Sequence, residues 1–112
     1  MSRLRHIADR YVEIVNSGEY HRLVELFAED ALFLGPGDRV LRGRAEIGAF
    51  YGDFLPTITP TIRINEYVEG NDHCVWELEA RSGDDNEFRL GAIDHATVGD
   101  DGLITRFAVF TK

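Results

Sequence analysis

The chain has 112 residues, a formal net charge of -8 at pH 7, and a composition that is 44% hydrophobic and 11% aromatic. This composition is that of an ordinary globular protein, and the length provides for one core, so we expect a single domain over residues 1–112. The acidic chain disfavours nucleic acid and anionic lipid as partners, because it has no basic stripe to neutralise their phosphates. The one cysteine, Cys74, excludes an internal disulfide, and the lack of a signal peptide or a bilayer-spanning stretch leads us to expect a cytoplasmic protein.

Two helices are expected at the start of the chain. Apolar residues that include Tyr11 and Ile14 recur at helical spacing and predict a helix over Arg3–Ser17. Gly18 is placed to end that helix in the left-handed conformation. A second, short helix is expected over Glu19–Phe27, so that the two helices form one layer that needs a partner surface.

A short strand and a third helix follow. Ala31–Leu34 is apolar and is expected to be a strand, which the GPGD turn at residues 35–38 ends. The apolar spacing over Ala45–Phe54 predicts the third helix. Pro56 is expected to prevent its continuation.

Four strands are expected in the rest of the chain, separated by turn signals at residues 70–72, 82–86 and 100–102. They are Thr61–Glu69, His73–Arg81, Arg89–Gly99 and Leu103–Thr111. This element order predicts an α+β fold in which three helices cover one side of a curved antiparallel sheet, with an internal pocket between the two layers.

Asp94 stands out because it shares one side of the Arg89–Gly99 strand with Leu90, Ala92, Ala96 and Val98. Burial of an ionised carboxylate is costly, so a buried Asp94 would keep its proton and donate a hydrogen bond. If the strand instead lies near a sheet edge, Asp94 meets water. The strand pattern leaves both interpretations open.

Three strings resemble the nuclear-transport-factor-2-like superfamily, in particular its SnoaL-like and ketosteroid-isomerase-like members. The strings are RYVEIVNSGEYHRLVELFAEDA at residues 10–31, LRGRAEIGAFY at residues 41–51 and AIDHATVGDDGLITRF at residues 92–107. The resemblance covers essentially the whole chain and implies a cone-shaped fold that pairs as a homodimer through the open side of its sheet. The same fold carries isomerases, cyclases, dehydratases, hydrolases and binding modules, so the fold alone does not specify the function.

The resemblance also implies site residues. Steroid isomerases of the family place a Tyr and an uncharged Asp around the carbonyl oxygen of the substrate. Tyr11 and Asp94 match these residues by their position in the strings, and Tyr51 matches a further pocket tyrosine. The match implies an oxyanion hole of Tyr11 and Asp94 for the carbonyl or phenol of a flat apolar ligand.

In the isomerases of this family, a carboxylate between the first strand and the third helix transfers the proton. The resemblance matches that position to Gly35 in this chain, and glycine has no side chain to accept a proton. Asp38, in the same loop, is the candidate base, and the alternative is that Asp38 is a solvated turn residue.

Three hypotheses for the function follow from these residues. The protein is an enzyme of the isomerase, cyclase or dehydratase type, a ligand-binding module without catalysis, or a protein-interaction module of the same fold.

Aromatic side chains are expected to line the ligand pocket, namely Phe27, Phe33, Phe50, Tyr51, Phe54 and Trp76, of which Trp76 is also a candidate core residue. His95 follows Asp94 and is expected on the opposite side of its strand, at an outer or dimer-contact position. The four histidines and Cys74 lack ligand spacing, so we expect neither a metal nor a cofactor.

Overall fold

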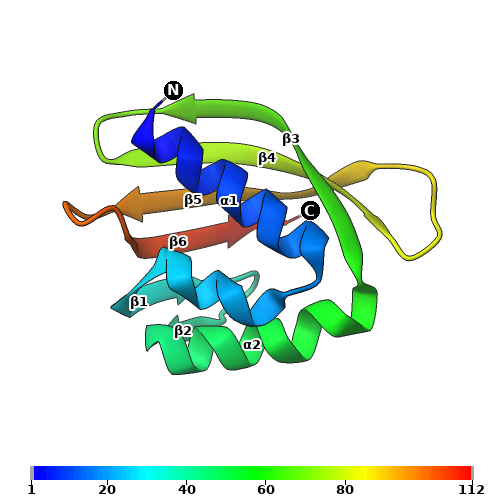
Figure 1. Cartoon of the computed structure of the whole chain (residues 1–112), viewed down its shortest axis with the longest axis horizontal. Coiled ribbons are helices and arrows are strands. Elements are labelled where there is room, and N and C mark those ends of the chain that lie inside the picture. The colour runs from blue at the N-terminus through cyan, green and yellow to red at the C-terminus, as the bar shows by residue number, and fades with distance from the viewer. Residues whose placement is uncertain (1, 112) are drawn as a thin grey trace.

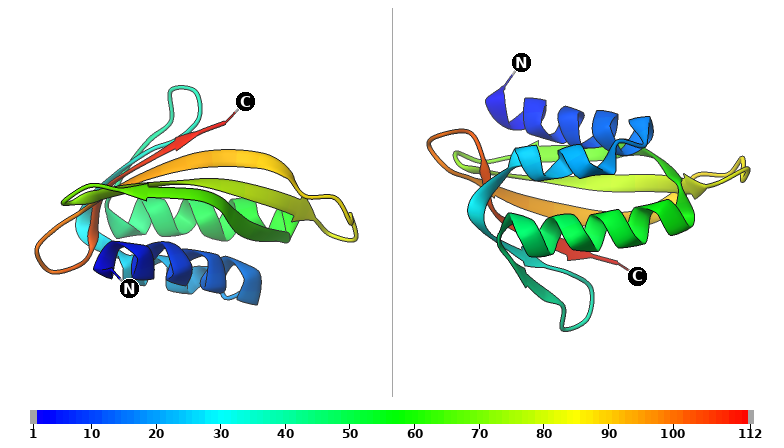
Figure 2. Two further views of the ribbon diagram at one scale, coloured as in Figure 1. Left: turned by 90° about the horizontal axis from the view of Figure 1, so that it is seen from above. Right: turned by 60° about the horizontal axis from the view of Figure 1, so that its bottom comes forward.

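The computed structural model describes residues 2–111, which form one curved six-stranded sheet with three helices on one of its faces (Figures 1 and 2). The helices are α1 (Arg3–Ser17), the 3-10 helix η1 (Tyr20–Leu26) and α2 (Gly43–Ile58). The strands are β1 (Phe27–Leu34), β2 (Val40–Arg42), β3 (Pro60–Glu69), β4 (His73–Ser82), β5 (Arg89–Val98) and β6 (Ile104–Phe110). This architecture confirms the predicted α+β fold.

The sheet is mixed, which corrects the expectation of a fully antiparallel sheet. Its strand order is β2-β1-β6-β5-β4-β3, and β1 runs parallel to β6 while the other neighbouring pairs are antiparallel. The chain leaves the β1–β2 hairpin, crosses through α2 to the far edge and returns as a four-strand meander. The last strand of the meander, β6, therefore arrives beside β1 in the same direction (Figure 1).

The helix boundaries match the prediction at the start of the chain and differ later. α1 has the predicted bounds, and Gly18 ends it with a left-handed φ of 82°. η1 starts one residue later and ends one residue earlier than the predicted helix over Glu19–Phe27. Phe27 instead begins β1, so the first strand starts earlier than expected.

The third helix continues through Pro56, contrary to the expectation that it stops before this residue. Pro56 lies in the last turn of α2, where its missing N–H removes one backbone hydrogen bond and the helix need not extend much further. Leu55 is buried against the core, and its carbonyl accepts a bond of 2.8 Å from the N–H of Thr59. These interactions stabilise the final turn.

A cluster of aromatic rings joins the helical layer to the sheet. The centre of this cluster is Phe107 on β6, which is completely buried. Its ring centroid lies 5.5–5.8 Å from the centroids of four other rings, those of Tyr11, Phe27, Phe33 and Trp76. Aromatic contacts at these distances stabilise a core beyond the area that they bury.

A side-chain bridge ties the end of α1 to the edge strand β3. The Asn16 amide donates to the carbonyl oxygen of Ile62 at 2.9 Å, and its Oδ1 accepts from the N–H of Ile62 at 2.7 Å. This pair of bonds satisfies backbone groups that an edge strand leaves open, and it fixes α1 across the sheet.

The start of α2 depends on Gly43, which has a φ of 80° and whose added Cβ would lie 3.1 Å from the carbonyl oxygen of Glu29. Gly43→Ala is expected to lower the free energy of unfolding by about 1–3 kcal/mol, because a side chain in this conformation is strained. Gly52→Ala, at an open position inside the same helix, is the control and is expected to raise it by about 0.5–1 kcal/mol. Urea unfolding measures both, and equal effects of the two substitutions would contradict the assigned start of α2.

Candidate functional site

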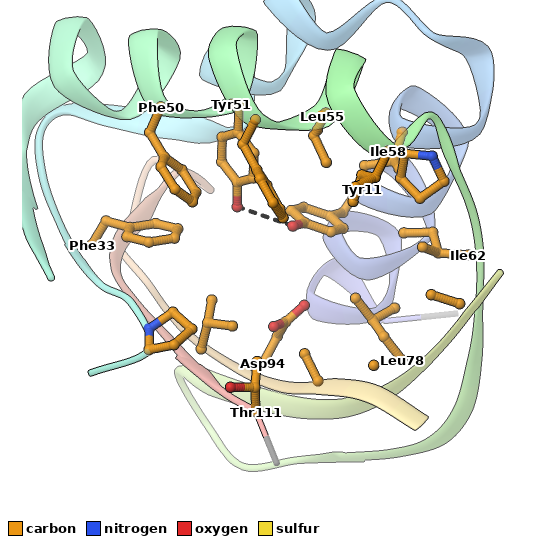
Figure 3. A pocket seen from close by; sticks show the side chains of 18 of the residues that line it. Tyr11, Phe33, Phe50, Tyr51, Leu55, Ile58, Ile62, Leu78, Asp94 and Thr111 are labelled. Carbon is orange, nitrogen blue, oxygen red and sulfur yellow. Dashed lines mark hydrogen bonds between the residues drawn. The ribbon is translucent and has the colours of Figure 1, made fainter. Parts of the chain in front are cut away.

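A cavity of about 380 Å³ lies between the helices and the inner face of the sheet (Figure 3). This volume is within the range of small-molecule sites in proteins. Most of its wall is apolar and is contributed by both layers, including Val15, Phe33, Phe50, Phe54, Leu55, Ile58, Ile62, Leu78 and Val109. The polar side chains of the lining are Tyr11, Arg39, Tyr51, Asp94 and Thr111.

Two tyrosines from different helices meet at the helical wall of the cavity. The hydroxyl oxygens of Tyr11 on α1 and Tyr51 on α2 are 3.0 Å apart, which is a hydrogen bond (Figure 3). Burial raises the pKa of both phenols well above the ordinary value, so both stay protonated. One hydroxyl donates to the other, and the proton of the second hydroxyl remains available to a ligand.

Asp94 faces this tyrosine pair from the sheet. It lies on the inner face of β5 and is 1% exposed, and its Oδ2 has no hydrogen-bond partner among the described residues. Figure 3 shows its carboxyl group pointing from the sheet toward the two hydroxyls. The alternative of a solvated Asp94 at a sheet edge is therefore wrong.

Burial raises the pKa of Asp94 to about 8. The indole N–H of Trp76, the cross-strand partner of Asp94, lowers this pKa by a smaller amount. Its Nε1 makes no hydrogen bond with any described residue, so the contact falls short of hydrogen-bond geometry. Near pH 7 the carboxyl is mostly protonated, and a protonated carboxyl donates one hydrogen bond. The cavity thus has a polar end with two available proton donors.

The structure brings together six of the residues predicted for the site, since Tyr11, Phe33, Phe50, Tyr51, Phe54 and Asp94 all line the cavity. Phe27 and Trp76 do not line it, which corrects the assignment of Phe27 to the pocket and favours the core interpretation of Trp76 over the pocket one. Both are completely buried and pack against the ring of Phe107 with centroid distances of 5.6 and 5.8 Å. They form the core beside the cavity.

Gly35 and Asp38 also lie outside the lining of the cavity. A Cβ added at Gly35 would lie 3.1 Å from the ring of Phe33 and 3.1 Å from Cδ of Arg39, so a side chain has no room there without a shift. Asp38 is exposed and lines a separate depression on the surface of the β1–β2 loop. Among the described lining residues, Asp94 is therefore the single carboxyl group.

Sequence reasoning missed Arg39, which lines the cavity from the end of the β1–β2 loop. The exposed polar loop contained no signal for this position, because the loop approaches the cavity only in the folded hairpin. Leu78 and Ile62 also line the cavity, and they could have been found from the alternation of their strands.

The remaining polar candidates lie elsewhere. His95 is on the face of β5 opposite Asp94, with its ring centroid 5.5 Å from that of His73, and burial together with His73 and Arg106 lowers its pKa. Within residues 2–111, no three His, Cys, Asp or Glu side chains gather to hold a metal ion. No helix in this range has the length and apolarity needed to cross a membrane.

Comparison with solved structures shows a shared fold. A Kribbella flavida protein assigned as a ketosteroid isomerase is 20% identical, with 98% of this chain and 78% of that chain covered and a TM-score of 0.82. SalBIII, an epoxide hydrolase/cyclase-like enzyme of pyran ring formation in the polyether salinomycin, is 24% identical, with coverages of 96% and 89% and a TM-score of 0.81. RV0760c from Mycobacterium tuberculosis, in complex with estradiol-17β-hemisuccinate, is 18% identical, with coverages of 100% and 95% and a TM-score of 0.81.

Sequence comparison identifies the family. A search of curated protein sequences finds no match. The model of the SnoaL-like domain matches residues 8–107, which is nearly the whole chain. This protein therefore belongs to the SnoaL-like domain family and shares its fold with ketosteroid-isomerase-like and nuclear-transport-factor-2-like proteins.

Proposed function

We propose that this protein binds a flat, mostly apolar small molecule and holds its carbonyl or phenol oxygen with hydrogen bonds from Asp94 and from the Tyr11–Tyr51 pair. The observation that supports this most directly is the buried Asp94 carboxyl in a mostly apolar cavity, because its Oδ2 has no hydrogen-bond partner among the described residues. A buried polar atom without a partner costs free energy that a ligand oxygen recovers.

The same arrangement suits a developing negative charge. When a carbonyl becomes an enolate, charge accumulates on its oxygen, and preorganised donors at that oxygen stabilise it. The low polarity of the cavity wall strengthens such bonds, because little water competes for them. Isomerase and cyclase names among the structural neighbours are consistent with this chemistry.

Binding accounts for the geometry better than acid–base turnover does. Proton transfer needs a base within hydrogen-bond reach of the ligand, and the one carboxyl of the lining is already used as a donor. Isomerase, cyclase or dehydratase activity would need Asp38 or a group of the substrate as the base. Such activity would be established if the protein converts a β,γ-unsaturated ketosteroid to its conjugated α,β-unsaturated isomer and if Asp38→Ala loses this conversion.

We also propose a homodimer that pairs through the sheet face left bare by the helices, which Figure 2 shows from the side. Val68 and Phe110 are 64% and 58% exposed, and their strand registers place them on this face. A sedimentation-equilibrium mass of one chain would exclude the dimer.

Removing either proposed donor is expected to weaken binding of estradiol, a flat phenolic steroid. Asp94→Leu should cost about 1–3 kcal/mol of binding free energy, because it leaves the phenol oxygen with one donor fewer. Tyr11→Phe should cost less, because the Tyr51 hydroxyl then has a free proton to donate. Asp94→Asn keeps a neutral N–H donor and should lose less than Asp94→Leu. Calorimetric titration measures all three.

Glu13→Gln, at an exposed position on α1, is the control for these titrations and should bind like the native chain. Unchanged affinity in both Tyr11→Phe and Asp94→Leu would contradict the proposed contact. Absence of saturable binding by both estradiol and 2-naphthol would contradict the pocket assignment itself.

The protonation of Asp94 predicts how stability depends on pH. In the unfolded chain this carboxyl loses its proton near pH 4, whereas in the folded chain its pKa is about 8. Between these values the folded state holds a proton that the unfolded state has lost, so rising pH favours unfolding. Asp94→Asn cannot ionise, so its free energy of unfolding lacks this pH dependence. The free energy of unfolding of Asp94→Asn minus that of the native chain should therefore increase by about 1.4 kcal/mol for each unit that the pH rises between pH 5 and pH 7.

Urea unfolding of both proteins at several pH values measures this difference, and the comparison cancels the contributions of the other titrating groups. The difference should stop growing above pH 8, where the folded carboxyl also ionises. A difference that stays constant from pH 5 to pH 7 would mean that Asp94 is ionised in the folded protein.

A further inference from the structure

Arg39 introduces a positive charge at the edge of an apolar cavity. Among the described lining residues it is the one cationic side chain, and it is exposed, whereas Asp94 is buried. The cavity therefore has a buried polar end that donates hydrogen bonds and an open end that carries a cation.

The position of Arg39 is defined by its surroundings. The carbonyl oxygen of Arg39 accepts a bond of 3.0 Å from the N–H of Gly35, which closes the β1–β2 loop. The absence of a side chain at Gly35 leaves room for the aliphatic part of Arg39. The guanidinium carbon lies 4.7 Å from the ring centroid of Phe50, a cation–π contact that leaves the N–H edge of the guanidinium open to an anion.

The Arg39 guanidinium has no internal counter-ion. Among the described residues no carboxylate oxygen lies within 4.0 Å of it, although Asp38 and Asp53 line depressions on either side. In the described part of the chain, five other arginines pair with carboxylates and five do not; the paired ones are Arg5, Arg10, Arg22, Arg63 and Arg89. Arg39 differs from the other unpaired arginines because it lines the cavity. An unpaired guanidinium beside a ligand cavity is suited to a carboxylate that the ligand supplies.

We propose that the ligand is an apolar acid whose carboxylate pairs with Arg39 at the open end of the cavity while its carbonyl or phenol oxygen lies at Asp94. This inference rests on the proposed function, because it assumes that the other end of the same molecule lies at Asp94. The formal net charge of -8 repels anions from most of the surface. An acid is therefore retained only where a local cation offsets that repulsion.

The test compares three ligands that share one phenolic steroid: estradiol, its 17β-hemisuccinate, and the methyl ester of that hemisuccinate. The acid and the ester have nearly the same shape and differ in charge. At low ionic strength the native chain should bind the acid roughly fivefold more tightly than the ester, as expected for a partly exposed ion pair. Added salt should reduce this preference.

Three arginine variants locate the anion. Arg39→Met keeps the aliphatic stem against Gly35 and should abolish the preference, whereas Arg39→Lys should retain part of it. Arg22→Met removes the same charge at a distant site on η1 and should leave the preference unchanged.

The outcomes separate this inference from the proposed function. Equal binding of acid and ester by the native chain, with both weakened in Asp94→Leu, would overturn the acid inference and leave the proposed function standing. Failure of estradiol and both derivatives to bind would overturn both. A preference that survives in Arg39→Met and is lost in Arg106→Met would overturn the assignment to Arg39 and place the anion in the neighbouring surface depression.

Discussion

The carboxyl group of Asp94 lies on the inner face of β5, almost without exposure, and its Oδ2 lacks a hydrogen-bond partner among the described residues. Burial disfavours the ionised carboxylate and raises the pKa of Asp94 to about 8, so near pH 7 the group mostly keeps its proton. The burial that stabilises the neutral state exists only while the helices cover this face of the sheet. Protonation of Asp94 and closure of the helical layer over the sheet therefore depend on each other.

The helical side of the site is held in place by packing. The ring of Tyr11 lies 5.8 Å from that of Trp76 and 5.5 Å from that of Phe107, so one residue belongs to the core and, through its hydroxyl, to the cavity. Tyr51 reaches the same point from α2 through the hydroxyl pair. In the proposed binding mode, donors that packing already holds in position lower the cost of binding a ligand oxygen.

The β1–β2 loop brings Arg39 to the edge of the cavity. Gly35 has no side chain, and the stem of Arg39 packs where a Cβ at Gly35 would project. The loop thus presents a cation at the edge of a mostly apolar cavity. Members of one fold can differ in chemistry through such loop residues, because the sheet and helices form the cavity and the loops carry groups at its edge.

Much of the fold could be predicted from the sequence, because its signals are local. The bounds of α1 and its end at Gly18 follow from periodicity and from the conformational freedom of glycine. Periodicity also assigned Asp94 to the apolar side of its strand, but the structure was needed to show that this side is buried. The turns that separate β3 to β6 follow from turn residues in the same way. The resemblance to a known family predicted that Tyr11, Tyr51 and Asp94 share one pocket. Periodicity within single elements could not predict this, because the three residues lie on three different elements.

Only the tertiary structure decided the features that depend on distant contacts. The parallel pairing of β1 with β6, the continuation of α2 through Pro56 and the burial of Phe27 in the core all arise from packing between segments far apart in the chain. The cavity and the position of Arg39 at its edge also depend on contacts between segments that are far apart in the chain. The physical reason is that a sequence pattern specifies which side of an element is apolar, whereas the partner that covers that side is chosen by the energy of the whole fold.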